Sequence, residues 1–255
     1  ANPDRRLLYL HGGAFTMGSP RSHRAITSKF SRLAGASVLA VDYRLIPENA
    51  RLDCLTDCQN AYRWILDNGP NGAHVVDKLF VAGDSAGGNL ALAVIAWARD
   101  AGLPSAHAAI ALSPVTDATL ASPSLIANIA TDHMLGPILG RIARMPKWLL
   151  VWFIWISNKA HPCDPRLSPL RGDLSHLPPT LIHASEAEML LDDARRYVNK
   201  ATEAGSEASL ETWHHMLHVW HIFEQKLPEA REAFEHIGVF IDRVAPRDQR
   251  RVDSG

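Results

Sequence analysis

The residues best suited to chemistry surround one serine, in the segment Gly83-Asp84-Ser85-Ala86-Gly87-Gly88. The segment follows a short apolar run and opens an apolar-periodic stretch, which predicts a tight turn from a strand into a helix. Glycines at 83 and 87 fit such a turn, because side chains there would collide with neighbouring backbone. The helix would direct its positive end at the serine. Ser85 is therefore the predicted nucleophile.

A serine hydroxyl is a poor nucleophile at neutral pH, so it needs a base within hydrogen-bond reach and a carboxylate that orients the base. The histidines that follow the last predicted strand are His214, His215, His218 and His221. His218 lies furthest along this loop before a new apolar stretch begins at Val219. We predict His218 as the base, with His215 as the alternative.

Acidic residues for the third position follow the apolar run 180–184, and they are Glu186, Glu188, Asp192 and Asp193. Asp192 and Asp193 fall at the start of a predicted helix, where the helix dipole and unpaired N–H groups account for them. Glu188 stands in the loop itself. We therefore predict Glu188 as the acid.

Nucleophilic attack on a carbonyl creates an oxyanion, which backbone N–H donors must stabilise. The first apolar run ends in His11-Gly12-Gly13-Ala14-Phe15. Small residues in this loop allow the backbone to approach a substrate closely. The predicted donors are the amides of Gly13, Ala14 and Ala86, with Gly12 shaping the loop.

The elements that would position these groups follow from the spacing of the apolar runs. Short runs cover residues 7–10, 38–42, 79–83, 108–112, 180–184 and 209–213. Helical patterns cover 57–66, 86–100, 190–204 and 229–244. Each gap between runs is long enough for a helix, so the pattern predicts a parallel sheet with right-handed helical crossovers.

The segment 117–162 interrupts this rhythm and is punctuated by prolines. We interpret it as a cap or lid inserted over the strand ends; an extra layer of core helices is the alternative. Its large aromatic residues would either line an apolar pocket or join the core. They are Trp148, Trp152, Phe153 and Trp155.

The composition excludes several classes of function. Lys plus Arg (26) nearly balance Asp plus Glu (27), so no overall field would draw the chain to nucleic acid or an anionic membrane. The apolar run 148–156 is far shorter than the roughly 20 residues of a membrane span.

The cysteines form a sparse, odd set without a metal-type cluster, and they are Cys54, Cys58 and Cys163. A reducing cytoplasm fits this set better than a disulfide framework. We read Cys54 and Cys58 as small core residues, and we expect neither a metal nor an organic cofactor.

The motifs occur together in one order along most of the chain: His11-Gly12-Gly13-Ala14, Asp42-Tyr43-Arg44-Leu45-Ile46-Pro47-Glu48, the Ser85 turn, and Asp164-Pro165-Arg166-Leu167-Ser168-Pro169-Leu170. This joint pattern resembles the hormone-sensitive-lipase-like family of α/β-hydrolases, which are bacterial carboxylesterases related to arylacetamide deacetylase. The resemblance implies an α/β fold with a mostly parallel central sheet flanked by helices and an inserted helical cap.

The resemblance also implies an activity: hydrolysis of short to medium acyl esters through an acyl-enzyme. Ser85, His218 and Glu188 match the family triad, although the family more often carries Asp at the third position. Ala14 replaces the family's third glycine, which is tolerable because the donor is a backbone N–H. Segments 43–48 and 164–170 would brace the loops around the site.

Several alternatives stay open at this point. A lipase, a lactone hydrolase or an amide deacetylase would use the same triad, and a non-catalytic binding module is a remoter alternative. A homodimer is expected only by analogy with such folds.

We treat residues 1–255 as one domain. Family members usually carry a longer segment before the glycine loop, with two edge strands and half of the cap. The sequence begins ten residues before His11. If that segment is absent from the protein, an open site and an exposed sheet edge are expected.

Overall fold

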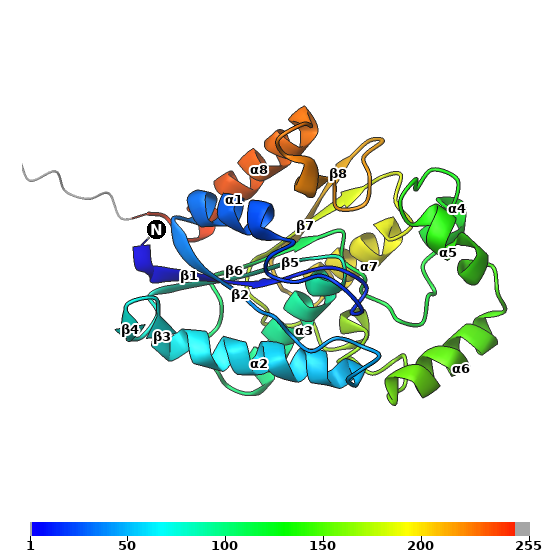
Figure 1. The fold of residues 1–255 in the computed structure, drawn as a ribbon, viewed down its shortest axis with the longest axis horizontal. Coiled ribbons are helices and arrows are strands. Elements are labelled where there is room, and N and C mark those ends of the chain that lie inside the picture. Colours follow the sequence, from blue (N-terminus) through cyan, green and yellow to red (C-terminus); the bar gives the residue numbers. More distant parts are fainter. Residues whose placement is uncertain (1, 248–255) are drawn as a thin grey trace, which may run out of the picture.

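The computed structural model describes residues 2–247, and the remaining ends of the predicted 1–255 domain lie outside it. Its centre is a six-stranded sheet with the order β2-β1-β5-β6-β7-β8, in which every neighbouring pair is parallel. Figure 1 shows the sheet crossing the molecule. The strands are β1 (Asn2–Leu10), β2 (Ala36–Ala40), β5 (Lys78–Asp84), β6 (Ala108–Leu112), β7 (Thr180–Ser185) and β8 (Ala208–Trp213). A separate hairpin pairs β3 (Asn68–Gly69) with β4 (Gly72–Ala73).

Helices connect the strands. They are α1 (Arg24–Ala34), α2 (Arg51–Asp67), α3 (Ala86–Asp100), α4 (Ser124–Ala127), α5 (Gly136–Ala143), α6 (Lys147–Asn158), α7 (Leu191–Glu203) and α8 (Pro228–Val244). Short 3₁₀ turns cover Pro169–Arg171 and Trp220–Phe223. The predicted α/β fold, with a mostly parallel central sheet flanked by helices, is therefore confirmed.

Alternate strand residues point to opposite faces of the sheet, and helices cover both faces. On one face, Leu8 and Val81 pack with buried side chains of α2, α3 and α7. On the other face, Leu7 and Phe80 pack with α1 and α8. Because both faces are buried, the strands read as continuous apolar runs in the sequence.

Helix α2 begins earlier than the predicted range 57–66. Its first residue, Arg51, is buried; its guanidinium lies 3.6 Å from the ring centroid of Phe15 and donates to Asn89 Oδ1 at 2.6 Å. A charged residue that is buried by long-range contacts looks like a surface residue in a periodicity analysis. That contact explains the missed first turns.

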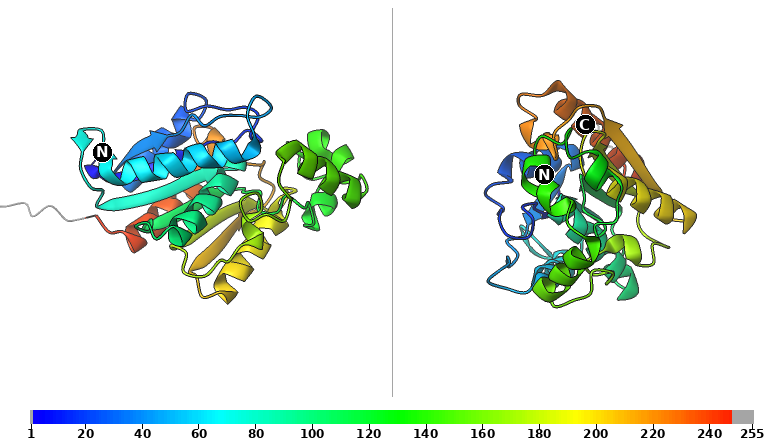
Figure 2. Two further views of the ribbon diagram at one scale, coloured as in Figure 1. Left: turned by 90° about the horizontal axis from the view of Figure 1, so that it is seen from below. Right: turned by 90° about the vertical axis from the view of Figure 1, so that its right-hand side faces the viewer.

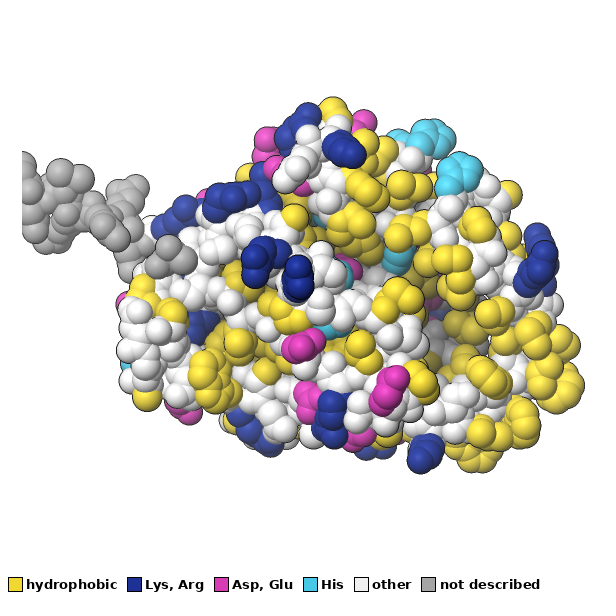
Figure 3. Space-filling view, in the orientation of Figure 1, with side chains coloured by type: hydrophobic (Ala, Val, Ile, Leu, Met, Phe, Trp, Pro, Cys, Tyr) yellow, Lys and Arg dark blue, Asp and Glu magenta, His cyan; other side chains and the backbone are white. Residues whose placement is uncertain are grey.

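The segment 117–162, which the sequence predicts to be an insertion, contains α4, α5 and α6 and lies between β6 and β7. Figure 2 shows these helices beyond the carboxyl ends of the strands, apart from the two helical layers. Its large aromatic residues do not join the core, because they are between 52% and 73% exposed on α6: Trp148, Trp152, Phe153 and Trp155. The space-filling view shows apolar side chains gathered at this end of the molecule (Figure 3).

Cys54 and Cys58 lie on the buried face of α2 and belong to the core, as expected from the sequence, whereas Cys163 is exposed. All three are free thiols. Burial raises the pKa of the Cys58 thiol well above its ordinary value. Within residues 2–247, no helix is long and apolar enough to cross a membrane.

Candidate active site

Ser85 occupies the sharp turn between β5 and α3, with φ 51° and ψ −116°. A non-glycine residue in this region is strained, and such strain persists only where the surroundings fix it. The Ser85 amide donates to Leu112 O at 2.7 Å. A Cβ at Gly83 would lie 2.3 Å from Gly87 O, and a Cβ at Gly87 would lie 2.0 Å from Leu10 O. Both positions of the turn therefore need glycine.

A continuous chain of hydrogen bonds joins the three residues predicted to react. His218 Nε2 lies 2.9 Å from Ser85 Oγ, and His218 Nδ1 lies 2.9 Å from Glu188 Oε2. Glu188 and His218 are buried. Because the carboxylate accepts the Nδ1 proton, Nε2 is left free to accept the serine proton. The arrangement can deprotonate Ser85 as it attacks a carbonyl.

The second oxygen of Glu188 also has a partner, since the Ser185 amide donates to Oε1 at 3.2 Å. This contact orients the carboxylate from the end of β7. Both oxygens of the Glu188 carboxylate are thus engaged, one by His218 and one by the backbone of Ser185.

The other histidines of this loop do not contact Ser85. His214 is exposed and its Nδ1 lies 2.6 Å from Glu186 Oε2, while His215 is exposed. His221 is buried and its Nε2 lies 3.1 Å from His183 Nδ1. The structure thus brings His218, and not His215, to the serine.

Asp192 and Asp193 lie in the first turn of α7 as predicted, but neither caps that helix. Asp193 is buried; its carboxylate accepts hydrogen bonds from the amides of Thr116 and Asp117 and from the Ser122 hydroxyl. Asp192 Oδ2 accepts from the Ser124 amide at 2.8 Å. The predicted pairing with unpaired N–H groups of this helix was wrong, because both carboxylates accept hydrogen bonds from residues 116–124 instead. Their place in the first turn still agrees with the expectation from the helix dipole. Burial raises the pKa of Asp193 to about 6.

The glycine loop after β1 adopts conformations that few residues can adopt. Gly13 has φ 121°, and a Cβ there would lie 2.1 Å from Met17 O. Ala14 has φ 54°. Among the described residues, the amides of Gly13 and Ala14 donate to no protein group. Ala86 is the first residue of α3, where amides have no intrahelical acceptor. These three amides are therefore available to an external oxygen.

Segment 43–48 braces this loop, as expected. Tyr43 Oη donates to His11 O at 2.6 Å, and the two rings stack with centroids 4.2 Å apart. The Ile46 amide donates to Phe15 O at 2.9 Å. The loop is thus held at both its beginning and its end.

Segment 164–170 closes the base of the insertion. Ser168 Oγ donates to Pro162 O at 2.6 Å and accepts from the Ala118 amide at 2.7 Å. One hydroxyl therefore joins the two ends of the inserted segment.

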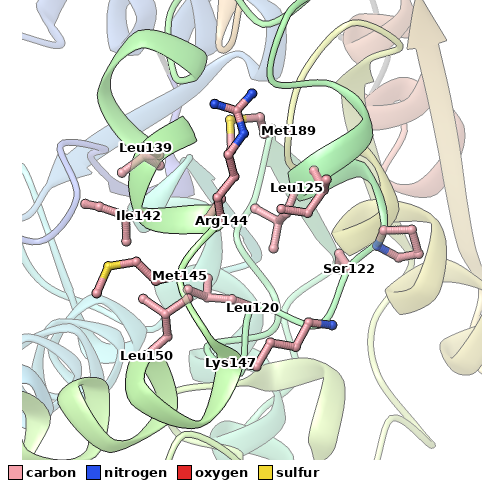
Figure 4. Close-up of a pocket in the computed structure, with 13 residues that line it drawn as sticks. Leu120, Ser122, Leu125, Leu139, Ile142, Arg144, Met145, Lys147, Leu150 and Met189 are labelled. Carbon is pink, nitrogen blue, oxygen red and sulfur yellow. The ribbon is translucent and has the colours of Figure 1, made fainter.

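An apolar cavity of about 470 Å³ lies within the insertion, close to the acid loop. Figure 4 shows its walls. The lining residues are Leu120, Ser122, Pro123, Leu125, Ile126, Leu139, Ile142, Ala143, Arg144, Met145, Lys147, Leu150 and Met189. Met189 directly follows Glu188, so the cavity and the triad share one loop. Most of the lining side chains are aliphatic or methionine, with Arg144 and Lys147 among them, whereas the sequence analysis had considered the aromatic residues of α6.

Sequence reasoning missed a group of insertion residues that contact the acid loop: Ser124, Asn128, Thr131 and Asp132. No spacing rule links residues near 128 to residues near 188. Among the described residues, no cluster of three His, Cys, Asp or Glu side chains is arranged to hold a metal ion.

Known proteins match this chain over most of its length. Residues 7–222 match a family model described as the alpha/beta hydrolase fold. The chain belongs to this α/β-hydrolase family. It is 40% identical over 238 residues to an acetyl-hydrolase of Streptomyces hygroscopicus, covering 93% of this chain and 75% of that protein. It is 37% identical to the carboxylesterase/phospholipase LipF of Mycobacterium tuberculosis, and the match spans 61% of that protein.

Solved structures similar to this α/β-hydrolase narrow the comparison to esterases. It matches the esterase EstE5 with a TM-score of 0.82 and 38% identity, covering 95% of this chain and 78% of that chain. It matches an esterase from the bacterial hormone-sensitive lipase family with a TM-score of 0.81 and 36% identity, covering 95% and 77%. The resemblance to hormone-sensitive-lipase-like esterases is therefore confirmed.

Proposed function

We propose that this α/β-hydrolase is a serine carboxylesterase with Ser85 as nucleophile, His218 as general base and acid, and Glu188 as the residue that orients the imidazole. The observation that carries the proposal is the unbroken chain of hydrogen bonds from Ser85 through His218 to Glu188. The esterase names of its relatives agree with this activity.

The geometry supports a two-step reaction. Ser85 Oγ attacks the ester carbonyl while His218 Nε2 takes its proton, and the buried Glu188 carboxylate stabilises the imidazolium. The amides of Gly13, Ala14 and Ala86 stabilise the oxyanion, each contributing about 3 kcal/mol by analogy with measured oxyanion donors. His218 then protonates the leaving alcohol. A water molecule, activated by the same imidazole, releases the acid from Ser85.

Esters of short to medium acyl chains are the proposed substrates. The cavity of about 470 Å³ beside the acid loop is lined mostly by apolar side chains, which suit an acyl chain, and Arg144 and Lys147 complete its lining. One relative is named an acetyl-hydrolase, which supports activity at the short end of this range. A lipase, lactone hydrolase or amide deacetylase differs only in the bond presented to the same triad.

A non-catalytic binding module is disfavoured by the intact contacts of the triad. Such a module has no need for a buried carboxylate that holds a histidine against a strained serine, and both features cost stability. Their joint presence therefore favours catalysis.

We further propose that the chain is one domain with residues 117–162 as its cap, that it acts in the cytoplasm, and that it forms a homodimer. Free Cys54, Cys58 and Cys163 support a reducing compartment. The exposed apolar face of α6 supports self-association. Light scattering at several concentrations tests the dimer, and a single monomeric mass would reject it.

Hydrolysis of p-nitrophenyl esters from acetate to palmitate tests the activity, with p-nitroacetanilide and a lactone as competing substrates. We expect the highest kcat/KM on esters of short to medium chains. Ser85→Ala should lower kcat by about 10⁴-fold or more. A higher kcat/KM on the anilide, the lactone or palmitate would identify an amide deacetylase, a lactone hydrolase or a lipase instead. No turnover of any substrate would reject catalysis.

A further inference from the structure

Side chains of the inserted segment hold the carbonyl groups of the loop that carries Glu188. Asn128 Nδ2 donates to Glu186 O at 3.0 Å and to Glu188 O at 2.9 Å. The hydroxyl of Thr131 donates to Ala187 O at 3.0 Å, with Asn128 O as a second acceptor at 3.2 Å. The Ser124 hydroxyl donates to Met189 O at 2.8 Å. Every carbonyl from residue 186 to residue 189 thus accepts a hydrogen bond from a side chain of the insertion.

Asp132 adds a charged contact to the same loop. Its Oδ2 accepts from the Met189 amide at 2.8 Å, while Oδ1 accepts from the amides of Met134 and Leu135 at the start of α5. The carboxylate is buried. Hydrogen bonds to a buried ionised group are stronger than neutral ones, so Asp132 couples the position of α5 to the residue after Glu188.

These contacts bear on the reaction because the backbone position of Glu188 determines where its carboxylate lies relative to His218. A displacement of about 1 Å in a reacting constellation can lower a rate by about 100-fold. The loop contains no regular secondary structure of its own, and its carbonyls take their side-chain partners from residues about 60 positions away in the sequence. Its amides at residues 186–188 donate to Ser185 and Trp213, whereas its carbonyls accept from the insertion, so its conformation depends on both.

We infer that Asn128 and Thr131 are positioning residues, through which the inserted segment aligns Glu188 with His218 in addition to forming the cavity. This inference rests on the proposed triad. It assigns to the insertion a role in the catalytic step itself, because a disturbed contact at Asn128 would misplace the acid without touching the substrate.

A double-mutant cycle between Asn128 and Glu188 tests the inference. Asn128→Ala removes both amide contacts, and we expect kcat on p-nitrophenyl acetate to fall about 10- to 100-fold with KM nearly unchanged. In a Glu188→Ala background the same change should lower kcat less than about threefold, because no acid is left to position. A role confined to folding would lower kcat equally in both backgrounds.

A substitution at Thr131 is a milder test and should leave folding intact, because Thr131 is exposed. Thr131→Val removes the hydroxyl donated to Ala187 O, and Thr131→Ser retains it. We expect Thr131→Val to lower kcat by about threefold or more and Thr131→Ser to match the wild type. Asn158→Ala is a matched control, because Asn158 lies in α6 of the same insertion and donates only to Ile154 O among the described residues.

The outcomes separate this inference from the proposed function. If wild type hydrolyses the ester, Ser85→Ala does not, and Asn128→Ala behaves like Asn158→Ala, the triad stands and the positioning role is overturned. Equal losses from Asn128→Ala in both backgrounds also overturn it. If wild type is inactive, the proposed function falls and the positioning role falls with it. Coupled losses, with Thr131→Ser restoring what Thr131→Val removes, establish it.

Discussion

Asp84 Oδ1 accepts the Gly12 amide at 3.0 Å, which ties the turn carrying Ser85 to the glycine loop after β1. The same oxygen accepts the Tyr9 hydroxyl at 2.6 Å, and the carboxylate is buried. His23 Nε2 lies 3.4 Å from the other oxygen. Asp84 therefore sets the distance between the nucleophile, Ser85, and the glycine loop that would stabilise the oxyanion.

The contact between His23 and Asp84 predicts a pH dependence of stability. Burial acts to lower the pKa of His23, but the hydrogen bond and charge of Asp84 outweigh burial and raise it. A raised folded-state pKa contributes stability that is fully present below the unfolded value of about 6.5 and is lost as pH rises through the folded value.

We therefore expect His23→Gln to reduce the free energy of unfolding most at pH 5.5, with the difference from wild type shrinking above neutral pH. Urea denaturation of both proteins between pH 5 and pH 9 measures this difference. A difference that stays constant, or that grows as pH rises, would show that Asp84 does not stabilise protonated His23.

The turn at Ser85 predicts a sharp difference between two glycines. Gly87→Ala places a Cβ 2.0 Å from Leu10 O, a rigid backbone atom, so we expect a loss of at least ~2 kcal/mol in the free energy of unfolding or failure to fold. Gly238→Ala is the matched control. It lies in α8, and its Cβ would lie 3.3 Å from the flexible end of Leu33.

Alanine favours helix by about 1 kcal/mol over glycine, so Gly238→Ala should change stability by less than ~1 kcal/mol. Urea unfolding compares the two variants. Equal effects at both positions would mean that the turn is less tightly packed than its geometry indicates.

The cavity predicts how acyl-chain length should respond to added bulk. Ala143→Phe adds a ring to the cavity wall. We expect kcat/KM to fall about tenfold or more for p-nitrophenyl octanoate and to change less than about twofold for the acetate. Trp152→Ala is the control, because Trp152 is 54% exposed and does not line the cavity.

A chain-length series with the three proteins decides this point. An unchanged profile in Ala143→Phe would show that the acyl chain lies elsewhere. If the dependence of kcat/KM on chain length changes only in Trp152→Ala, the acyl chain binds at the aromatic face of α6 instead.

The local rules of sequence were sufficient where a feature depends on neighbours in the chain. Helix α3 occupies the predicted range 86–100, and the ranges predicted for α7 and α8 are correct within one residue. The Ser85 turn was predictable because a strand, two glycines and a helix must follow one another to make it. The positions of Glu188 and His218 followed from the strands that precede them.

Features that depend on contacts between distant segments could not be predicted from the sequence. Strand β2 ends at Ala40, before the predicted end at residue 42. The bonds of Asp193 to residues 116–122, and those of Asn128 to residues 186–188, join segments with no pattern in common. Burial of this kind appears only when the chain is folded. The position of Asp193 in the first turn of α7 was therefore predictable, whereas its bonds to residues 116–122 were not.

The central claim is that Ser85 is the nucleophile, and covalent labelling tests it most directly. Wild type and Ser85→Ala are treated with a fluorophosphonate, and intact mass and peptide mapping locate the adduct. The account predicts one adduct per wild-type chain, on Ser85, with loss of ester hydrolysis in proportion to labelling, and no adduct on Ser85→Ala. An adduct on another residue, or an unlabelled wild type that still hydrolyses esters, would contradict it.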